Sequence, residues 1–228
     1  MKIINMTFMA RTKLTFREIY QGFKIKVLYR FVLFYFVFCG IVPSFTNYFY
    51  YYLTDDLDFS QLEYATLNIV SSLLLLLGIY CYNKWFIETE STYMLAACCF
   101  INAFGGLNSM LLIRGFSYGM NPKAFAFMSG SVTDSLSSSI RLLSGNVLFA
   151  KLIPANIEAS MFAILTGLIN FCNFFLAKQL GNFINIFVGV TNDDLSDLWI
   201  LFAIMSGCAL IPLLFVWLIP KRKEVFLV

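Results

Sequence analysis

The sequence contains no histidine, only 5 prolines and only 13% charged residues among its 228 residues. Histidine is the commonest general base and metal ligand of proteins, so its absence argues against a hydrolase or a metalloenzyme. Soluble domains have about 25% charged residues. Because 60% of the residues are hydrophobic and the mean hydropathy is +0.77, we predict an integral membrane protein that is not an enzyme, with no cofactor, no metal and no nucleic-acid partner.

The sequence also has no C-x-x-C pair. Its six cysteines all lie in apolar runs or at their ends, which favours small buried side chains over metal ligands or disulfides. They are Cys39, Cys81, Cys98, Cys99, Cys172 and Cys208.

Long apolar runs dominate what is present. A bilayer core about 30 Å thick needs roughly 20 apolar residues in a helix, and six runs meet this length: 31–53, 62–82, 93–113, 124–149, 158–180 and 198–219. The fourth is the weakest, because residues 130–146 include serines, an acid and an arginine, but its flanks and its place in an even series favour a span. Pro43 should kink the first helix. We therefore predict an all-α membrane protein with a bundle of six transmembrane helices over 31–220.

Charge is distributed unevenly about these runs. Lys and Arg cluster in the segment 1–30 and in the tail 221–228, whereas the loops 54–60 and 191–197 are acidic and contain neither. The loop 114–123 is a modest exception. By the positive-inside rule, both termini should face the same cytosol-like or matrix-like side.

The segment 1–30 carries an amphipathic pattern before the first run. Four apolar side chains recur at helical spacing, and three basic ones lie largely off that face, which predicts a short interfacial helix. These are Phe16, Ile19, Tyr20 and Phe23, and Lys13, Arg17 and Lys24. A mitochondrial targeting segment would also be basic, so the mitochondrial inner membrane stays open as a location.

Two opposite charges interrupt the fourth run. Asp134 and Arg141 are seven residues apart, with Ser138 between them, so they lie near one helix face. A charge at the bilayer centre costs about 2.5–3.5 kcal/mol, so the pair should face protein or water. Either these residues form a substrate or proton site, with Arg141 binding a carboxylate, or they form a structural ion pair.

Other polar residues at helical spacing admit two interpretations. Three serines on the fourth run repeat every four residues and fit close helix packing, and three residues on the fifth run share a polar face that would either pack or line a cavity. They are Ser131, Ser135 and Ser139, and Thr166, Asn170 and Asn173.

Residues 147–173, VLFAKLIPANIEASMFAILTGLINFCN, resemble a known signature. In folate–biopterin transporters, an Ala/Ser-Lys-Leu-x-Pro-x-Gly-x-Glu loop leads into a helix with Phe-Ala-Leu-Leu and then Asn. Asn156 replaces the glycine. The matching positions are Lys151, Leu152, Pro154, Glu158, Phe162, Ala163, Leu165 and Asn170.

This resemblance to the folate–biopterin transporter family implies a major facilitator fold, of which the chain is similar to the C-terminal six-helix half. Such transporters hold their substrate between two halves. The resemblance implies a pteridine or folate-like anion as ligand. In the transporter hypothesis, Arg141 binds its carboxylate and Asp134 couples protons. Besides the lipid bilayer, we expect another six-helix half, a second copy or a larger membrane complex as partner. The alternative is a structural accessory subunit, for example in an organelle inner membrane, that has lost transport.

Overall fold

The computed structural model describes residues 9, 17, 20–153 and 157–221, and all regular structure in these ranges is helical. The predicted interfacial helix relies on Lys13, Phe16 and Ile19, which lie outside the described residues. So do residues 222–228 of the predicted tail.

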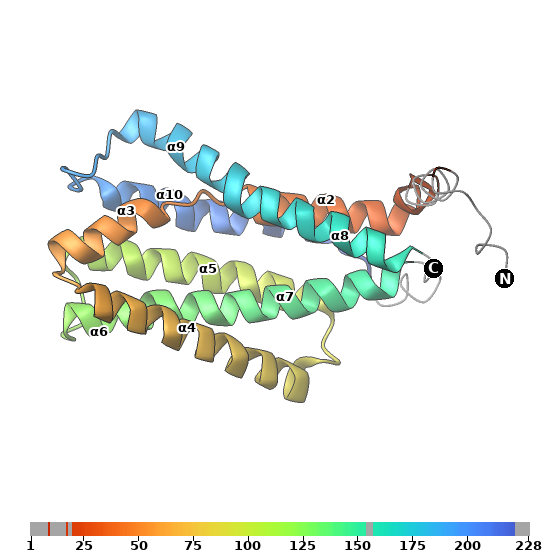
Figure 1. Ribbon diagram of the computed structural model, residues 1–228, viewed down its shortest axis with the longest axis horizontal. Helices are drawn as coiled ribbons and strands as arrows, with labels where there is room; N and C mark the ends of the chain where they lie inside the picture. The colour runs from red at the N-terminus through yellow and green to blue at the C-terminus, as the bar shows by residue number, and fades with distance from the viewer. Residues whose placement is uncertain (1–8, 10–16, 18–19, 154–156, 222–228) are drawn as a thin grey trace.

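The described helices follow one another as six long rods (Figure 1). Several rods contain a short π-helical or 3₁₀ segment, labelled η. In chain order the rods are α2 (Lys26–Gly40) with α3 (Thr46–Tyr51) and η1 (Tyr52–Asp56); α4 (Gln61–Cys81) with η2 (Tyr82–Phe86); α5 (Ser91–Ile113); α6 (Pro122–Ala126) with η3 (Phe127–Val132) and α7 (Thr133–Leu152); α8 (Glu158–Asn170) with η4 (Phe171–Leu176) and α9 (Ala177–Val188); and α10 (Leu198–Leu210) with η5 (Ile211–Leu218).

Four of these rods are long and apolar enough to cross a membrane: Gln61–Phe86, Ser91–Ile113, Glu158–Val188 and Leu198–Leu218. The other two differ for separate reasons. In the first, α2 has 15 residues, fewer than the roughly 20 that a span needs. The fourth has the length but carries the polar run of residues 130–146. The chain is thus an integral multi-pass membrane protein, and six spans remain a prediction.

The first rod is broken at Pro43, where the sequence predicts a kink. Helix α2 ends at Gly40 and α3 starts at Thr46, because proline has no N–H to continue the helix. The Ser44 N–H instead donates to the carbonyl of Ala177 on α9 over 2.9 Å. A Cβ atom on Gly181 would lie 2.5 Å from the Ser44 carbonyl oxygen, so glycine permits this close crossing of the break and α9.

Helix α5 occupies the middle of the bundle, between α10 and α7, and α4 packs on α7. Figure 1 shows α4 on the outer edge of this group and α8–α9 with α2 along the opposite edge. The α4–α7 contact uses the predicted serine repeat. Ser135 donates to the Ser71 carbonyl over 2.8 Å, and Ser139 sits against Gly78. The packing interpretation is therefore confirmed for Ser135 and Ser139.

Two apolar clusters fill the bundle, one toward each end. The first contains Phe31, Phe34 and Phe149, and the second contains Tyr52 and Phe202. The start of the first rod and the end of the last meet beside the first cluster, where Arg30 Nη2 donates to the Trp217 carbonyl over 2.6 Å. With an even number of described rods, the first rod therefore starts at the same end of the bundle at which the last rod ends.

Candidate functional site

A cavity of about 410 Å³ lies where the broken first rod faces α5, α7, α10 and the η4–α9 junction. Its walls include Phe38 and Cys39 from the first apolar cluster, and Phe45 and Phe202 from the second. The cavity therefore borders both clusters, and the helix break at Pro43 forms part of its wall. Irregular backbone within a membrane protein is tolerated where it lines such a space.

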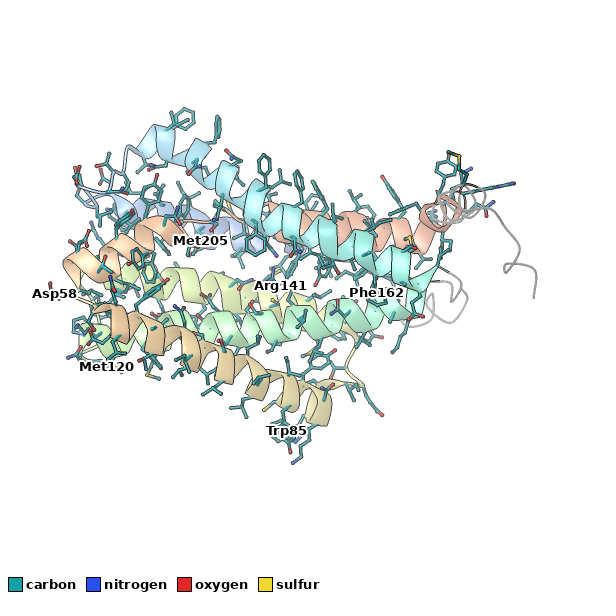
Figure 2. The ribbon with its side chains drawn as sticks, in the orientation of Figure 1. Asp58, Trp85, Met120, Arg141, Phe162 and Met205 are labelled. Carbon is teal, nitrogen blue, oxygen red and sulfur yellow. The ribbon has the colours of Figure 1, made fainter. Side chains whose placement is uncertain are left out.

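Arg141 is the cation of this cavity, and Figure 2 shows it near the middle of the bundle. Its Nη1 atom donates to Asn173 Oδ1 over 3.2 Å and points at Cys39 Sγ, 4.0 Å away. The Tyr35 hydroxyl donates to the Arg141 carbonyl over 2.9 Å. Two neighbouring helical segments, α2 and η4, thus hold both the backbone and the side chain of this arginine.

Asp134 and Ser138 line the same cavity as Arg141, as their spacing on one helix predicts. Asp134 is exposed, and within the part of the chain that the structure describes it has neither a hydrogen bond nor an ion pair with Arg141. Seven residues of α-helix separate the two Cα atoms by about 10.5 Å along the axis. Asp134 and Arg141 therefore do not form a direct structural ion pair with each other.

Asn170 and Asn173, which the sequence places on one polar face, lie on different faces of their rod. Asn173 lines the cavity, whereas Asn170 is exposed and lies outside its lining. The cause is the π-helical segment η4, which begins at Phe171. A π-turn contains more residues than an α-turn, so positions three apart across it no longer share a face.

A hydrogen-bonded chain across α5 and α7 escaped the sequence analysis. The Ser137 hydroxyl donates to Asn102 Oδ1 over 2.5 Å, and Cys98 Sγ lies 2.9 Å from the Ser137 hydroxyl. Asn102 and Ser137 both line the cavity. The available signal was Asn102 within a mainly apolar span, since such polar residues are costly in lipid.

The described positions of the family signature lie outside the cavity lining, and Lys151, Leu152 and Glu158 flank the joint between α7 and α8. Lys151 and Glu158 are exposed there, as is Ala163. Phe162 packs edge-on against Phe149, with ring centroids 5.2 Å apart, and Figure 2 shows it well separated from Arg141 along the bundle. Pro154 lies outside the described residues. The signature thus marks a helix joint.

Outside the membrane-spanning rods, Asp194 orders the loop between α9 and α10. One of its carboxylate oxygens accepts from the Ser196 N–H over 3.1 Å. Hydrogen bonds from the side chain and the backbone of Ser196 lower the pKa of Asp194. A second, smaller space of about 290 Å³ lies at the opposite end of the bundle, where Glu88 and Lys151 are among its lining residues. In the described ranges no three His, Cys, Asp or Glu side chains gather to hold a metal ion.

The chain matches a known protein family and several curated proteins. The BT1 family model matches residues 1–226. The chain is 26% identical over 209 residues to a folate-biopterin transporter of Synechocystis sp., covering 91% of this chain and 42% of that protein. It is 24% identical to probable folate-biopterin transporter 4 of Arabidopsis thaliana, with 89% and 41% covered, and 22% identical to folate transporter 1 of Plasmodium falciparum, with 90% and 41% covered.

No solved structure matches the chain significantly. The chain spans about two fifths of the length of the curated relatives it matches. The folate–biopterin transporter resemblance inferred from residues 147–173 is confirmed, and the match over nearly the whole chain shows that it belongs to the BT1 family.

Proposed function

We propose that the chain forms one half of a membrane transporter, in which the cavity at Arg141 binds an anionic ligand of the pteridine or folate type. The observation that carries this proposal is the free side of the Arg141 guanidinium. Both acceptors found for it among the described residues, Asn173 and Cys39, are at Nη1. Nε and Nη2 keep three N–H donors in the planar arrangement that binds a carboxylate through two parallel hydrogen bonds.

The ligand class draws on the relatives, whose names describe transport of folate and biopterin. The walls of the cavity fit that chemistry: Phe38, Phe45 and Phe202 offer apolar and aromatic surface, and Asn102 and Ser109 offer polar groups. A pteridine ring is flat and carries hydrogen-bonding atoms at its edge. An aromatic-lined space with a few polar groups suits such a ring.

Asp134 is our candidate for proton coupling. It lines the ligand cavity without a direct pairing to Arg141 among the described residues, so protonation of Asp134 would not break a salt bridge to Arg141. Intramembrane carboxylates commonly act as proton relays. We propose that an incoming anion and a proton share this cavity.

A second half, carried on the same polypeptide or on another chain, would cover the cavity. Two outer rods support such a partner, because they expose polar side chains within apolar helices. Asn68 and Ser72 do so on α4, and Asn170 and Gln179 do so on α8 and α9. Uncovered polar groups at membrane depth are costly in lipid. A second copy or a larger complex would meet the same need.

The test is ligand binding and uptake by native membranes containing the full chain, using radiolabelled folate. Arg141→Gln should weaken binding by about tenfold or more, because a hydrogen-bonded charge is lost, and Arg141→Lys should recover part of it. The matched control is Lys84→Gln, which removes an exposed cation that lies beside Tyr80 and Trp85 and away from the cavity. Unchanged binding by folded Arg141→Gln protein would refute the carboxylate role.

The accessory-subunit alternative makes a different prediction. Mild-detergent purification followed by mass spectrometry would then recover a large membrane complex in fixed ratio, and wild-type membranes would bind no folate above those lacking the chain. Recovery of a six-helix partner or a second copy, together with ligand binding, favours the transporter half.

A further inference from the structure

Lys178 is a second cation near the cavity that the ligand model does not use. It lies on α9, inside the membrane-spanning rod Glu158–Val188, and is exposed. Among the described residues it has no hydrogen bond, ion pair or aromatic contact. Its position is ten residues before Val188, or about 15 Å along the helix axis. A lysine at that depth needs an aqueous or anionic neighbour.

The neighbour of Lys178 is a small recess of about 50 Å³ between α9 and the start of α3. Its other lining residues include Asn182 and the hydroxyl pair Ser44 and Thr46, whose oxygens lie 3.0 Å apart. A recess of this size fits one carboxylate-sized group but no ring. Lysine, amide and hydroxyl groups are all able to donate hydrogen bonds to an anion.

The recess adjoins the main cavity. Ser44, Phe45 and Thr46 line both spaces, so the segment at the helix break forms a common wall. Along α9 and η4, Lys178 is five residues beyond Asn173, which holds Arg141. The segment 44–46 therefore lies between a space that contains Arg141, the cavity, and a space that contains Lys178, the recess.

We propose that Lys178, with Ser44 and Thr46, forms a second anion subsite that selects ligands carrying two anionic groups. This inference rests on the proposed function, because it assumes that the first anionic group binds Arg141. The two subsites together would distinguish a pteridine with a dicarboxylate tail from one with a single carboxylate. The shared wall of Ser44, Phe45 and Thr46 would lie alongside the part of the ligand that joins the two anionic groups.

The experiment compares two radiolabelled ligands on native membranes containing the full chain. Folate carries a glutamyl tail with two carboxylates, and pteroate carries a single carboxylate. Lys178→Gln should weaken folate binding about fivefold or more, a size expected for one partly solvated charge contact, and leave pteroate binding unchanged. Lys178→Arg should keep the folate preference. Lys84→Gln serves as the control for loss of an exposed cation elsewhere.

The outcomes separate the two proposals. A folate-to-pteroate preference that is unchanged in Lys178→Gln, while Arg141→Gln loses both ligands, would overturn the subsite and keep the proposed function. Equal weakening of both ligands by Lys178→Gln would also overturn it, because the charge would then act on the cavity in general. Binding of neither ligand by wild-type membranes would overturn the proposed function and the subsite together.

Discussion

Replacing Gly181 by alanine should destabilise the protein, because this glycine lies where the broken first rod crosses α9. A new Cβ atom would meet the Ser44 carbonyl oxygen at 2.5 Å and a ring carbon of Phe45 at 3.3 Å. The first of these is backbone, so no rotamer change relieves it. Overpacking of this kind costs about 1–3 kcal/mol. Separating the segments would also weaken the hydrogen bond from the Ser44 N–H to Ala177, for about 1 kcal/mol more.

These effects amount to about 2–4 kcal/mol, of which the higher helix propensity of alanine offsets about 1 kcal/mol, since Gly181 lies inside α9. The net loss of about 1–3 kcal/mol corresponds to a fall in Tm of about 2–12 °C for a chain of this size. The measurement is thermal unfolding of purified full-length protein in mild detergent, followed by intrinsic fluorescence. Gly167→Ala is the matched control, because Gly167 lies on the same rod and nothing would contact its Cβ within 4 Å. That change should be neutral or raise Tm slightly, since alanine favours helix by about 1 kcal/mol. Equal Tm values for the two variants would refute the close crossing.

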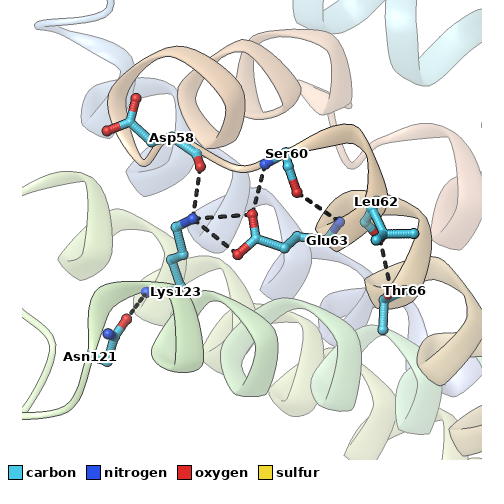
Figure 3. A network of polar contacts seen from close by, with 7 residues as sticks. All are labelled: Asp58, Ser60, Leu62, Glu63, Thr66, Asn121 and Lys123. Atoms are coloured by element: carbon cyan, nitrogen blue, oxygen red, sulfur yellow. Dashed lines mark hydrogen bonds and ion pairs between the residues drawn. The ribbon is translucent and has the colours of Figure 1, made fainter.

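Three smaller predictions follow from other contacts. Tyr35→Phe removes the hydrogen bond to the Arg141 carbonyl and should cost about 1 kcal/mol in unfolding free energy, measured by the same thermal assay; no loss would contradict that contact. Lys123→Met breaks the contacts of Lys123 Nζ with both Glu63 carboxylate oxygens, at 3.1 Å each, shown in Figure 3, so Tm should become less sensitive to salt than in the wild type; an unchanged salt dependence would argue against the pair. Asp194 has a lowered pKa, so its loop stabilisation is present above the unfolded-state pKa and is lost only as pH falls through the folded value; proteolysis of that loop should be the same at about pH 7 and about pH 5, and faster cleavage at the lower pH would contradict it.

The sequence was sufficient for features that depend on a single residue or on a single regular helix. Pro43 lacks an N–H, so a break there follows from covalent chemistry, and α2 indeed ends at Gly40. Asp134 and Arg141 share a face because both lie on one regular helix, and both line the cavity. Such features need no knowledge of how the rods pack.

The sequence was insufficient where the position of a side chain depends on how neighbouring rods pack or on an irregular helical turn. The contact of Ser137 with Asn102 joins two helices and depends on their packing register. The π-helical segment that starts at Phe171 rotates Asn173 relative to Asn170, and regular helical spacing contains no trace of it. The separation of Phe162 from Arg141 likewise depends on the length of α7 and its joint with α8.

The meeting of Arg30 with Trp217 has a practical consequence for protein engineering. The start of the first rod and the end of the last lie side by side, and Pro220 lines the same small space as the Ile87–Glu90 connection. A circular permutant could link the end of the last rod to the start of the first rod and be cut between Ile87 and Glu90. The new linker and the new termini would then lie at the same end of the bundle. The order in which the rods are inserted would change while their packing partners stay the same, so such a permutant would separate insertion order from final packing.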